Sequence, residues 1–361
     1  MLSIMMNIDG KLFQDIFERY YRDENFSGVG LVRLGNKNLF LNAYGFAHKG
    51  WQIQNQISTR FDTASITKLF TAVAVLKLID QGSLSLTDTA VAVLGLENTK
   101  ISDKVNVYHL LTHTSGIGDD ADEEAGESYE ALWKDKPNYS VRETIDFLPQ
   151  FINKEPNFEP GQGCRYNNVA YILLGLIVER LTGMKYRDYM KENLFNKLGM
   201  SSTEFCSTDG VFSNVAEGYV KITAENSGRL IGWRKNIYSY PPVGSPDGGA
   251  YSTVEDLDRF IRELKNGKFL SAPLTRELFT PKEVYRERDD DIRMTGYGFQ
   301  FTTKHNGEII SIHKDGVNPG VACILSYYPK QDLTLAILAN QDCNVWNMRK
   351  EIHSLILKEM L

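Results

Sequence analysis

The chain has 361 residues, 42% of them apolar and 24% charged, and this composition predicts a globular protein with one large domain or two of ordinary size. Its net charge of -6 at pH 7, without any lysine- or arginine-rich run, argues against nucleic-acid binding. No apolar run reaches membrane-spanning length, residues 1–10 lack the features of a secretory signal, and the four cysteines have no metal-type spacing, so we expect a cytoplasmic protein.

The first elements expected along the chain are a helix and an antiparallel pair of strands. The helix is predicted over residues 10–22 and the strands over 27–33 and 38–46. Gly35 and Asn36, between the two apolar runs, form a hairpin turn signal.

A second helix is predicted over residues 61–82, with Gly82 at its end and with Ser65 and Lys68 near its start. Residues three apart share one face of a helix, so these two side chains would be neighbours. A serine hydroxyl becomes a nucleophile only when a base takes its proton. Burial among the apolar residues that follow would lower the pKa of the lysine, and a helix N-terminus favours developing negative charge. The pair therefore predicts an activated serine; the alternative is a helix N-cap region with a solvated lysine.

The same Ser-x-x-Lys spacing recurs at Ser311 and Lys314, but in a different context. Residues 309–313 alternate like a strand, where positions three apart point to opposite faces. This second serine and lysine therefore cannot meet, and only Ser65 and Lys68 are chemically competent.

An acidic segment follows a short helix in the middle of the chain. The helix is expected over residues 103–114, and residues 118–135 are predicted to form a solvated loop or lid. For the acidic run from Asp119 to Glu127, helix capping or solubility is favoured over substrate binding.

The remaining elements predict how the chain is organised. Helices are expected over residues 169–181, 256–265 and 348–361, short strands over 205–250, and longer strands over 299–303, 308–313, 321–328 and 333–340. Strands cluster at both ends and helices in the middle. We therefore predict an α+β fold, in which an antiparallel sheet built from both termini is flanked by helices and carries an all-helical insertion. The expected subdomains are about 1–62 with 245–361, and 63–244.

Tyr166 and Asn168 form the only Tyr-x-Asn in the chain, placed between a Pro-Gly turn and a helix. Two nearby lysines would lower the pKa of the tyrosine, which could then act as general base toward Ser65 and later toward water. Asn168 could orient the lysine or hold a substrate carbonyl. The alternative is a structural tyrosine in a turn.

Lys314, Asp315 and Gly316 follow the strand predicted over residues 308–313. Two other Lys-x-Gly matches in the chain lie at predicted helix ends, where glycine is an expected cap. A lysine at a strand end can attract a substrate carboxylate, and the glycine lets substrate approach the backbone. The N–H groups of Val317 and Ser65 are predicted to form an oxyanion hole.

In this order, Ser-x-x-Lys, Tyr-x-Asn and Lys-x-Gly resemble the serine β-lactamase and penicillin-binding-protein superfamily. The similarity is to the branch of class C β-lactamases and related esterases and D-amino-acid peptidases, and it spans about residues 15–355. Further similar stretches are residues 109–116, 158–161, 194–200 and 248–253. The resemblance implies the β-lactamase/transpeptidase-like fold and a serine hydrolase that forms an acyl-enzyme on an amide, lactam or ester.

The resemblance also implies roles for single residues. Ser65 would be the acylated nucleophile, Lys68 its proton partner and Tyr166 the general base. Asn168 would contact substrate or lysine, and Lys314 would occupy the third-motif lysine position. Asp315 departs from the Thr or Ser usual in this class, and we expect it to weaken Lys314 and repel a substrate carboxylate. Because related esterases often carry His in place of the lysine, Lys314 itself favours carboxylate-bearing substrates, and the substrate class stays open.

Rival functions are a metal site, an α/β-hydrolase, and a member of the fold that does not turn over. His109 and His113 are four apart on a predicted helix but lack the zinc-protease glutamate, so packed or hydrogen-bonded histidines are favoured. The residues two before and two after Ser65 are threonines, so the Gly-x-Ser-x-Gly elbow is absent. A penicillin-binding-type protein that acylates but turns over slowly, or a non-catalytic ligand-binding member, remains the alternative. We expect a small-molecule or short-peptide substrate, with no metal and no cofactor.

Overall fold

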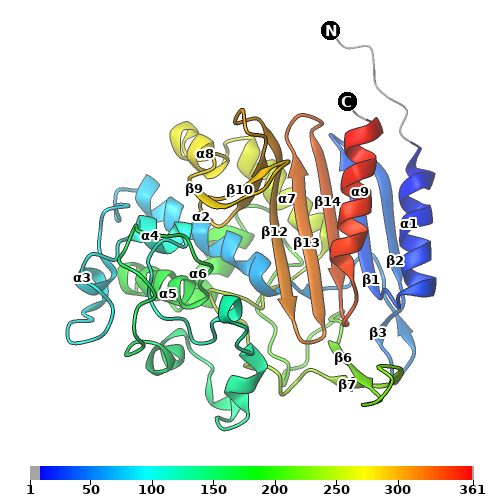
Figure 1. Ribbon diagram of the computed structural model, residues 1–361, viewed down its shortest axis with the longest axis horizontal. Coiled ribbons are helices and arrows are strands. Elements are labelled where there is room, and N and C mark those ends of the chain that lie inside the picture. The colour runs from blue at the N-terminus through cyan, green and yellow to red at the C-terminus, as the bar shows by residue number, and fades with distance from the viewer. Residues whose placement is uncertain (1–8, 360–361) are drawn as a thin grey trace.

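The computed structural model describes residues 9–359 and contains an eight-stranded antiparallel sheet with helices on both sides (Figure 1). The strands lie in the order β2-β1-β14-β13-β12-β11-β10-β9. Their bounds are Gly28–Leu34 (β1), Lys37–Tyr44 (β2), Glu283–Glu287 (β9), Ile292–Thr295 (β10), Gln300–Thr303 (β11), Ile309–Asn318 (β12), Val321–Tyr328 (β13) and Leu333–Ala339 (β14). Because β1 pairs with β14, the two ends of the chain meet within the sheet, as the predicted α+β fold requires.

The sheet separates two apolar cores. Helices α1 (Gly10–Asp23) and α9 (Val345–Glu359) cover one face, while α2 (Thr67–Asp80), α5 (Val169–Thr182) and α7 (Val254–Lys265) belong to the layer on the other (Figure 1). In β14, Ile337 packs in the α1/α9 core and Leu338 in the opposite core, because neighbours along a strand point to opposite faces. Burial on both faces explains why six of the seven residues of this strand are apolar.

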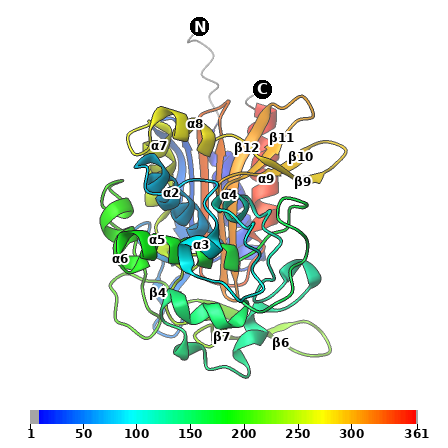
Figure 2. The same ribbon diagram turned by 90° about the vertical axis from the view of Figure 1, so that its left-hand side faces the viewer.

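The helical layer faces the viewer in Figure 2 and contains most of the remaining elements. The helices are α3 (Ala90–Leu94), α4 (Val107–Thr112), α6 (Tyr186–Met190) and α8 (Ala272–Leu278). Short 3-10 or π turns are η1 (Ala64–Ile66), η2 (Glu123–Ala125), η3 (Tyr129–Trp133), η4 (Asn138–Ser140), η5 (Thr144–Gln150) and η6 (Lys191–Phe195). Two-stranded pairs join β3 (Phe46–His48) to β4 (Ile53–Gln54), β5 (Phe61–Asp62) to β8 (Tyr251–Ser252), and β6 (Tyr219–Thr223) to β7 (Leu230–Lys235). The insertion predicted as all-helical therefore also contains the hairpin β6–β7.

The single helix predicted over residues 61–82 is wrong at its start. Phe61 pairs with Ser252 in the short ladder of β5 and β8, and Ala64 has a positive φ of 42°, which breaks helical continuity. Ser65 lies in the 3-10 turn η1, and the α-helix begins at Thr67. The predicted position of Ser65 at a helix N-terminus holds, but a strand and a strained turn precede it.

Most other predicted helices are confirmed within a few residues. α1 matches the helix predicted over 10–22, α7 the one over 256–265, and α5 ends at Gly183 in the left-handed conformation expected of a C-cap. The helix expected over 103–114 is shorter, because His113 adopts a left-handed φ of 61° and ends α4. The tail helix begins three residues before the predicted start at 348, and its last two predicted residues, 360–361, lie outside the described residues. Residues 1–8, most of the segment expected to lack a secretory signal, also lie outside them.

Strands β9 and β10 were not predicted. β9 is the edge strand and β10 lies between it and β11, and both have partly polar sequences, so they lack the apolar runs that identified the central strands. All four cysteines are free thiols. Between residues 9 and 359, every helix is too short or too polar to cross a membrane.

Candidate active site

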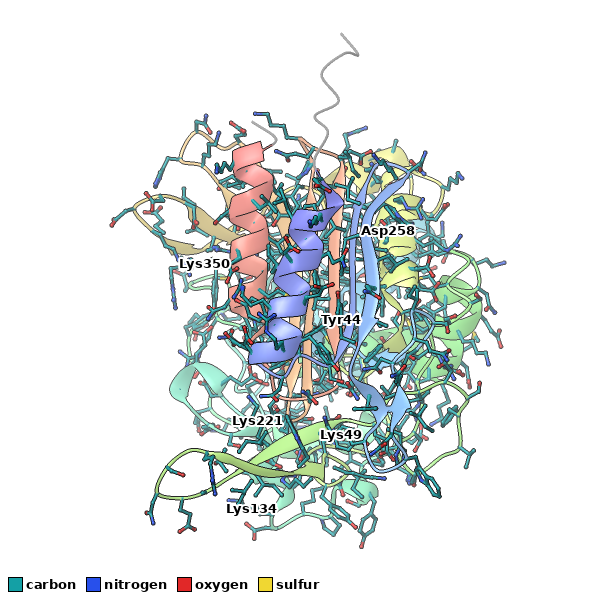
Figure 3. All side chains as sticks on the ribbon, turned by 90° about the vertical axis from the view of Figure 1, so that its right-hand side faces the viewer. Tyr44, Lys49, Lys134, Lys221, Asp258 and Lys350 are labelled. Atoms are coloured by element: carbon teal, nitrogen blue, oxygen red, sulfur yellow. The ribbon has the colours of Figure 1, made fainter. Side chains whose placement is uncertain are left out.

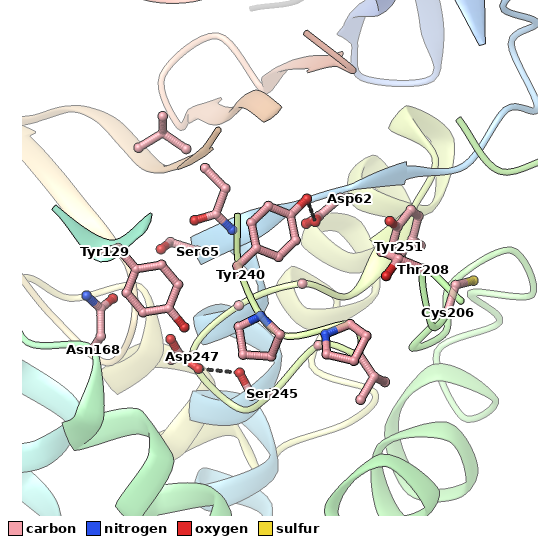
Figure 4. Close-up of a pocket in the computed structure, with 18 of the residues that line it drawn as sticks. Asp62, Ser65, Tyr129, Asn168, Cys206, Thr208, Tyr240, Ser245, Asp247 and Tyr251 are labelled. Atoms are coloured by element: carbon pink, nitrogen blue, oxygen red, sulfur yellow. Dashed lines mark hydrogen bonds between the residues drawn. The ribbon is translucent and has the colours of Figure 1, made fainter. Parts of the chain in front are cut away.

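Ser65 lies on the turn between β5 and α2, and the carboxylate of Asp62 holds this turn. Asp62 Oδ1 accepts the Ala64 N–H at 2.7 Å, and Asp62 Oδ2 accepts the hydroxyl of Tyr240 at 3.0 Å (Figure 4). Burial raises the pKa of Asp62 to about 6. Asp62 therefore satisfies the backbone at the strained residue that precedes Ser65.

Lys68 is fully buried, one helical turn after Ser65. Its Nζ lies 3.2 Å from Ser65 Oγ and donates to Asn168 Oδ1 at 2.8 Å and to the Asp247 carbonyl oxygen at 2.7 Å. Burial lowers the pKa of Lys68, while the carboxylates of Asp247 and Glu123 partly oppose that shift. The expected contact between Ser65 and Lys68 is present, and the solvated-lysine alternative does not hold.

Tyr166 and Lys314 complete a ring of polar groups around Ser65 and Lys68. Lys314 Nζ lies 3.5 Å from the Tyr166 hydroxyl and 4.5 Å from the centre of its ring, and Lys68 Nζ lies 5.1 Å from the same ring centre. The His113 ring also packs against Tyr166, with ring centres 4.7 Å apart. The structure therefore brings residues of all three predicted motifs together around Ser65.

The predicted pKa shift of Tyr166 has the wrong sign. Burial, followed by the negative charge of Glu123, raises the pKa of Tyr166 well above its usual value. The pKa values of the two lysines are lowered instead: burial and the charge of Lys68 lower the pKa of Lys314 to about 7, and burial lowers that of Lys68. Tyr166 is therefore a neutral phenol near pH 7, and the two amines lose protons more readily than free lysines do.

The sequence predicts Lys314 just after a strand, and this is wrong: Lys314 lies inside β12, opposite Leu325 of β13. Strand β12 continues through Gly316, and a Cβ atom at Gly316 would lie 2.2 Å from the Thr63 carbonyl oxygen. Only glycine allows the strand to approach the turn that carries Ser65. The two residues predicted for the oxyanion hole, Ser65 and Val317, line the same pocket.

The Asp315 side chain points away from this pocket, which corrects its predicted place in substrate binding. Its two carboxylate oxygens accept from Arg349 Nη1 of α9 at 2.7 and 2.9 Å. Because neighbours along a strand face opposite sides, Asp315 lies behind the sheet when Lys314 faces Ser65. The expected repulsion of a substrate carboxylate by Asp315 is therefore removed.

The acidic segment is predicted to be solvated, but the structure buries two of its residues, Asp119 and Asp120. Asp119 accepts the N–H groups of Asn168 and Val169 at 2.9 and 3.1 Å, so it caps the start of α5 and positions Asn168. Glu123 lies in the same segment and its Oε1 accepts from Asn168 Nδ2 at 3.4 Å. Capping, one of the favoured interpretations, holds for Asp119, whereas the segment also borders the site.

Several site residues were missed from the sequence. They are Asp62, Asp119, Glu123, Tyr129, Tyr240 and Asp247, which line the pocket around Ser65 or support it (Figure 4). Asp119 and Glu123 belong to the acidic run, but the others carry no local sequence signal. Their convergence depends on loops that join distant parts of the chain.

His109 and His113 are bound to backbone groups. His113 Nδ1 accepts the Asn167 N–H at 3.2 Å, and His109 Nδ1 accepts the Asn106 N–H at 3.4 Å in the cap of α4. Both contacts agree with the interpretation of these residues as hydrogen-bonded histidines.

The chain is similar in sequence and fold to known proteins. A family model described as Beta-lactamase matches residues 13–356. Penicillin-binding protein 4* of Bacillus subtilis (strain 168) is 27% identical over 343 residues, which cover 92% of this chain and 72% of its own length. Protein flp of Staphylococcus aureus (strain N315) is 25% identical over 90% of this chain, which spans 62% of that protein. The crystal structure of a penicillin binding protein from Bacillus halodurans is 34% identical, covers 95% of this chain and 99% of its own, and superposes with a TM-score of 0.86.

Proposed function

The chain belongs to the beta-lactamase family, and we propose that it is a serine hydrolase that works through an acyl-enzyme on Ser65. The observation that carries this proposal is the fully buried Lys68, whose Nζ lies 3.2 Å from Ser65 Oγ and is held by two further acceptors. A buried amine with a lowered pKa is the group that can take a serine proton near neutral pH.

Acylation begins when Ser65 Oγ attacks a substrate carbonyl carbon and its proton passes to the neutral amine of Lys68. The Asn168 side chain and the Asp247 carbonyl oxygen already accept from this amine and stabilise its charged form. The N–H groups of Ser65 and Val317 hold the negative oxygen of the tetrahedral intermediate.

Tyr166 then serves as a proton relay. As the bond between the carbonyl carbon and the leaving nitrogen or oxygen breaks, the neutral phenol gives its proton to the leaving atom and regains one from Lys68. Deacylation runs the same transfers in reverse, with water in place of the leaving group. The high pKa of Tyr166 favours this role over that of a resting-state base.

Lys314 supports a preference for substrates that carry a carboxylate. Its amine borders Tyr166, whereas Asp315 is engaged by Arg349 on the other face of the sheet. A carboxylate near Lys314 would raise the pKa of that lysine and form an ion pair with it. We therefore propose a β-lactam or a D-amino-acid peptide ahead of a simple ester.

A slowly released acyl-enzyme is the second candidate, because the 34% identical structure is that of a penicillin binding protein. In that case Ser65 is labelled but few turnovers follow. We also propose two subdomains, residues 1–62 with 245–361 and residues 63–244, and a cytoplasmic location.

The test compares a cephalosporin, a D-alanyl peptide and a short-chain ester on wild-type protein and on Ser65→Ala. We expect a covalent adduct by intact mass and hydrolysis of at least one substrate, both lost in Ser65→Ala and both unchanged by a chelator. Ser311→Ala is the matched control, because its serine belongs to the other Ser-x-x-Lys and points away from Lys314. Labelling or hydrolysis that survives in Ser65→Ala contradicts the proposal, and labelling without turnover supports the second candidate.

A further inference from the structure

A second cavity lies on the opposite face of the sheet, between the strands around β12 and helix α9. Its volume is about 590 Å³, and Arg293, His313, Asp315 and Arg349 are among the residues that line it. This volume is within the range of small-molecule sites, about 300–1,000 Å³. His313 and Asp315 face this cavity because they flank Lys314, which faces Ser65. We call it the rear cavity.

The rear cavity carries an excess of positive charge in a chain whose net charge is -6. Asp315 is paired with Arg349, and Asp291 Oδ1 lies 3.4 Å from Arg293 Nε. Arg288 and Lys350 also line the cavity, and neither forms an ion pair with another residue between 9 and 359 (Figure 3 labels Lys350 on α9). Two carboxylates therefore face four cations.

His313 adds a buried donor. Its Nε2 lies 3.4 Å from Arg293 Nη1, and because arginine can only donate, Nε2 must accept and the ring proton must reside on Nδ1. His313 is only 4% exposed, and its Nδ1 has no hydrogen-bond partner within the described chain. Burial and the neighbouring Arg349 and Arg293 lower the pKa of His313 well below its usual value, so the ring is neutral. A buried N–H without an acceptor destabilises the free protein, and a bound oxygen that accepts from it would remove that penalty.

We infer that the rear cavity binds a small organic anion bearing carboxylate or phosphate groups. Its oxygens are attracted by Arg288 and Lys350 at the rim. A shift of the His313 ring on binding would bring its Nδ1–H, which is closed off in the free protein, to one of these oxygens. Charge-assisted hydrogen bonds of this kind are roughly twice as strong as neutral ones. The sheet would lie between the ligand and Ser65, so the rear cavity is distinct from the site that holds the substrate.

The test is calorimetric titration of the full chain with citrate and, separately, with pyrophosphate. The double variant Arg288→Gln/Lys350→Gln removes the two unpaired cations at the rim, and Lys191→Gln/Lys197→Gln removes two exposed lysines of the helical layer as a charge-matched control. We expect at least one anion to bind wild type and the control equally, and the rim variant to bind it at least about tenfold more weakly. The tighter of the two anions identifies the preferred oxyanion, carboxylate or phosphate.

Nitrogen-15 NMR of the histidine rings provides a readout that does not depend on a variant's stability. We expect the His313 Nδ1–H resonance to move downfield when the anion binds, and His313→Phe to weaken binding at least about tenfold. The inference is overturned if neither anion binds at millimolar concentration, or if the rim variant binds as well as the control and the His313 resonance does not move.

Discussion

The identity of the group that takes the Ser65 proton can be decided by the pH dependence of acylation. Tyr166 as the base would require phenolate, and with its pKa raised above 10 the phenolate population at pH 7 is below about one in 1,000, a penalty above about 4 kcal/mol. The pKa of Lys68 is lowered by burial, so its neutral form is reached at a lower pH than that of a free lysine.

The direction in which the acylation rate changes with pH follows from the protonation state that Lys68 needs as a base. If Lys68 is the acceptor, acylation rises with pH as Lys68 loses its proton and reaches a plateau below about pH 10, the usual range of lysine. A neutral ester is the substrate of choice, because deprotonation of Lys314 near its pKa of about 7 would weaken the binding of a carboxylate and distort the profile.

Lys68→Met tests the same point by substitution. Loss of general base catalysis predicts an acylation rate lower by about 10²–10⁴-fold, or roughly 3–5 kcal/mol of barrier. The variant should fold, because methionine fills a similar volume and only three partners, on Ser65, Asn168 and Asp247, lose their contact with the amine, at about 1–3 kcal/mol each. Tyr166→Phe retains the ring and is expected to slow both acylation and deacylation.

Stopped-flow acylation from about pH 5 to 11, with a thermal melt of each variant, provides the measurement. A rate that rises only above about pH 10, or a folded Lys68→Met variant within about tenfold of wild type, would refute Lys68 as the proton acceptor.

Three further predictions concern the framework of the site. Gly316→Ala places a Cβ atom 2.2 Å from the Thr63 carbonyl oxygen, so we expect about 1–3 kcal/mol of destabilisation and slower acylation; an unchanged melting temperature and rate would contradict the close approach. Asp119→Ala removes the acceptor of two N–H groups at the start of α5 and should cost about 1–3 kcal/mol in denaturant unfolding, whereas Asp119→Asn, which keeps an oxygen, should cost less; equal effects would contradict capping. Phe70→Ala empties a fully buried position with two edge-on aromatic neighbours and should cost about 3–5 kcal/mol in the same assay while the folded fraction is still labelled at Ser65; a loss below about 1 kcal/mol would contradict that packing.

Local sequence was sufficient for the chemistry that depends on short spacings. The i, i+3 separation predicts the contact of Ser65 with Lys68, and the alternation of apolar residues correctly excludes Ser311 as its equivalent. Helix ends were also readable, as Gly183 illustrates, because glycine adopts the left-handed conformation without a steric penalty.

Properties set by burial could not be read locally. The carboxylate of Asp119 belongs to an acidic run whose composition predicts solvation, yet it is buried against the start of α5. The lysines near Tyr166 predict a lowered pKa, but desolvation by the surrounding loops is the larger effect and raises it. Neither outcome has a sequence signal, because each depends on segments that are far apart along the chain.

The sequence by itself determined the fold class, the family resemblance and the candidate residues Ser65, Lys68, Tyr166 and Lys314, because helix and strand periods and short motifs are local properties. Only the tertiary structure decided which way Asp315 points and which protonation states the site holds. The reason is physical: pairing of β12 with β13 extends the strand through Gly316 and turns Asp315 toward Arg349, and burial in a shared pocket sets the proton affinities of its amines and phenol.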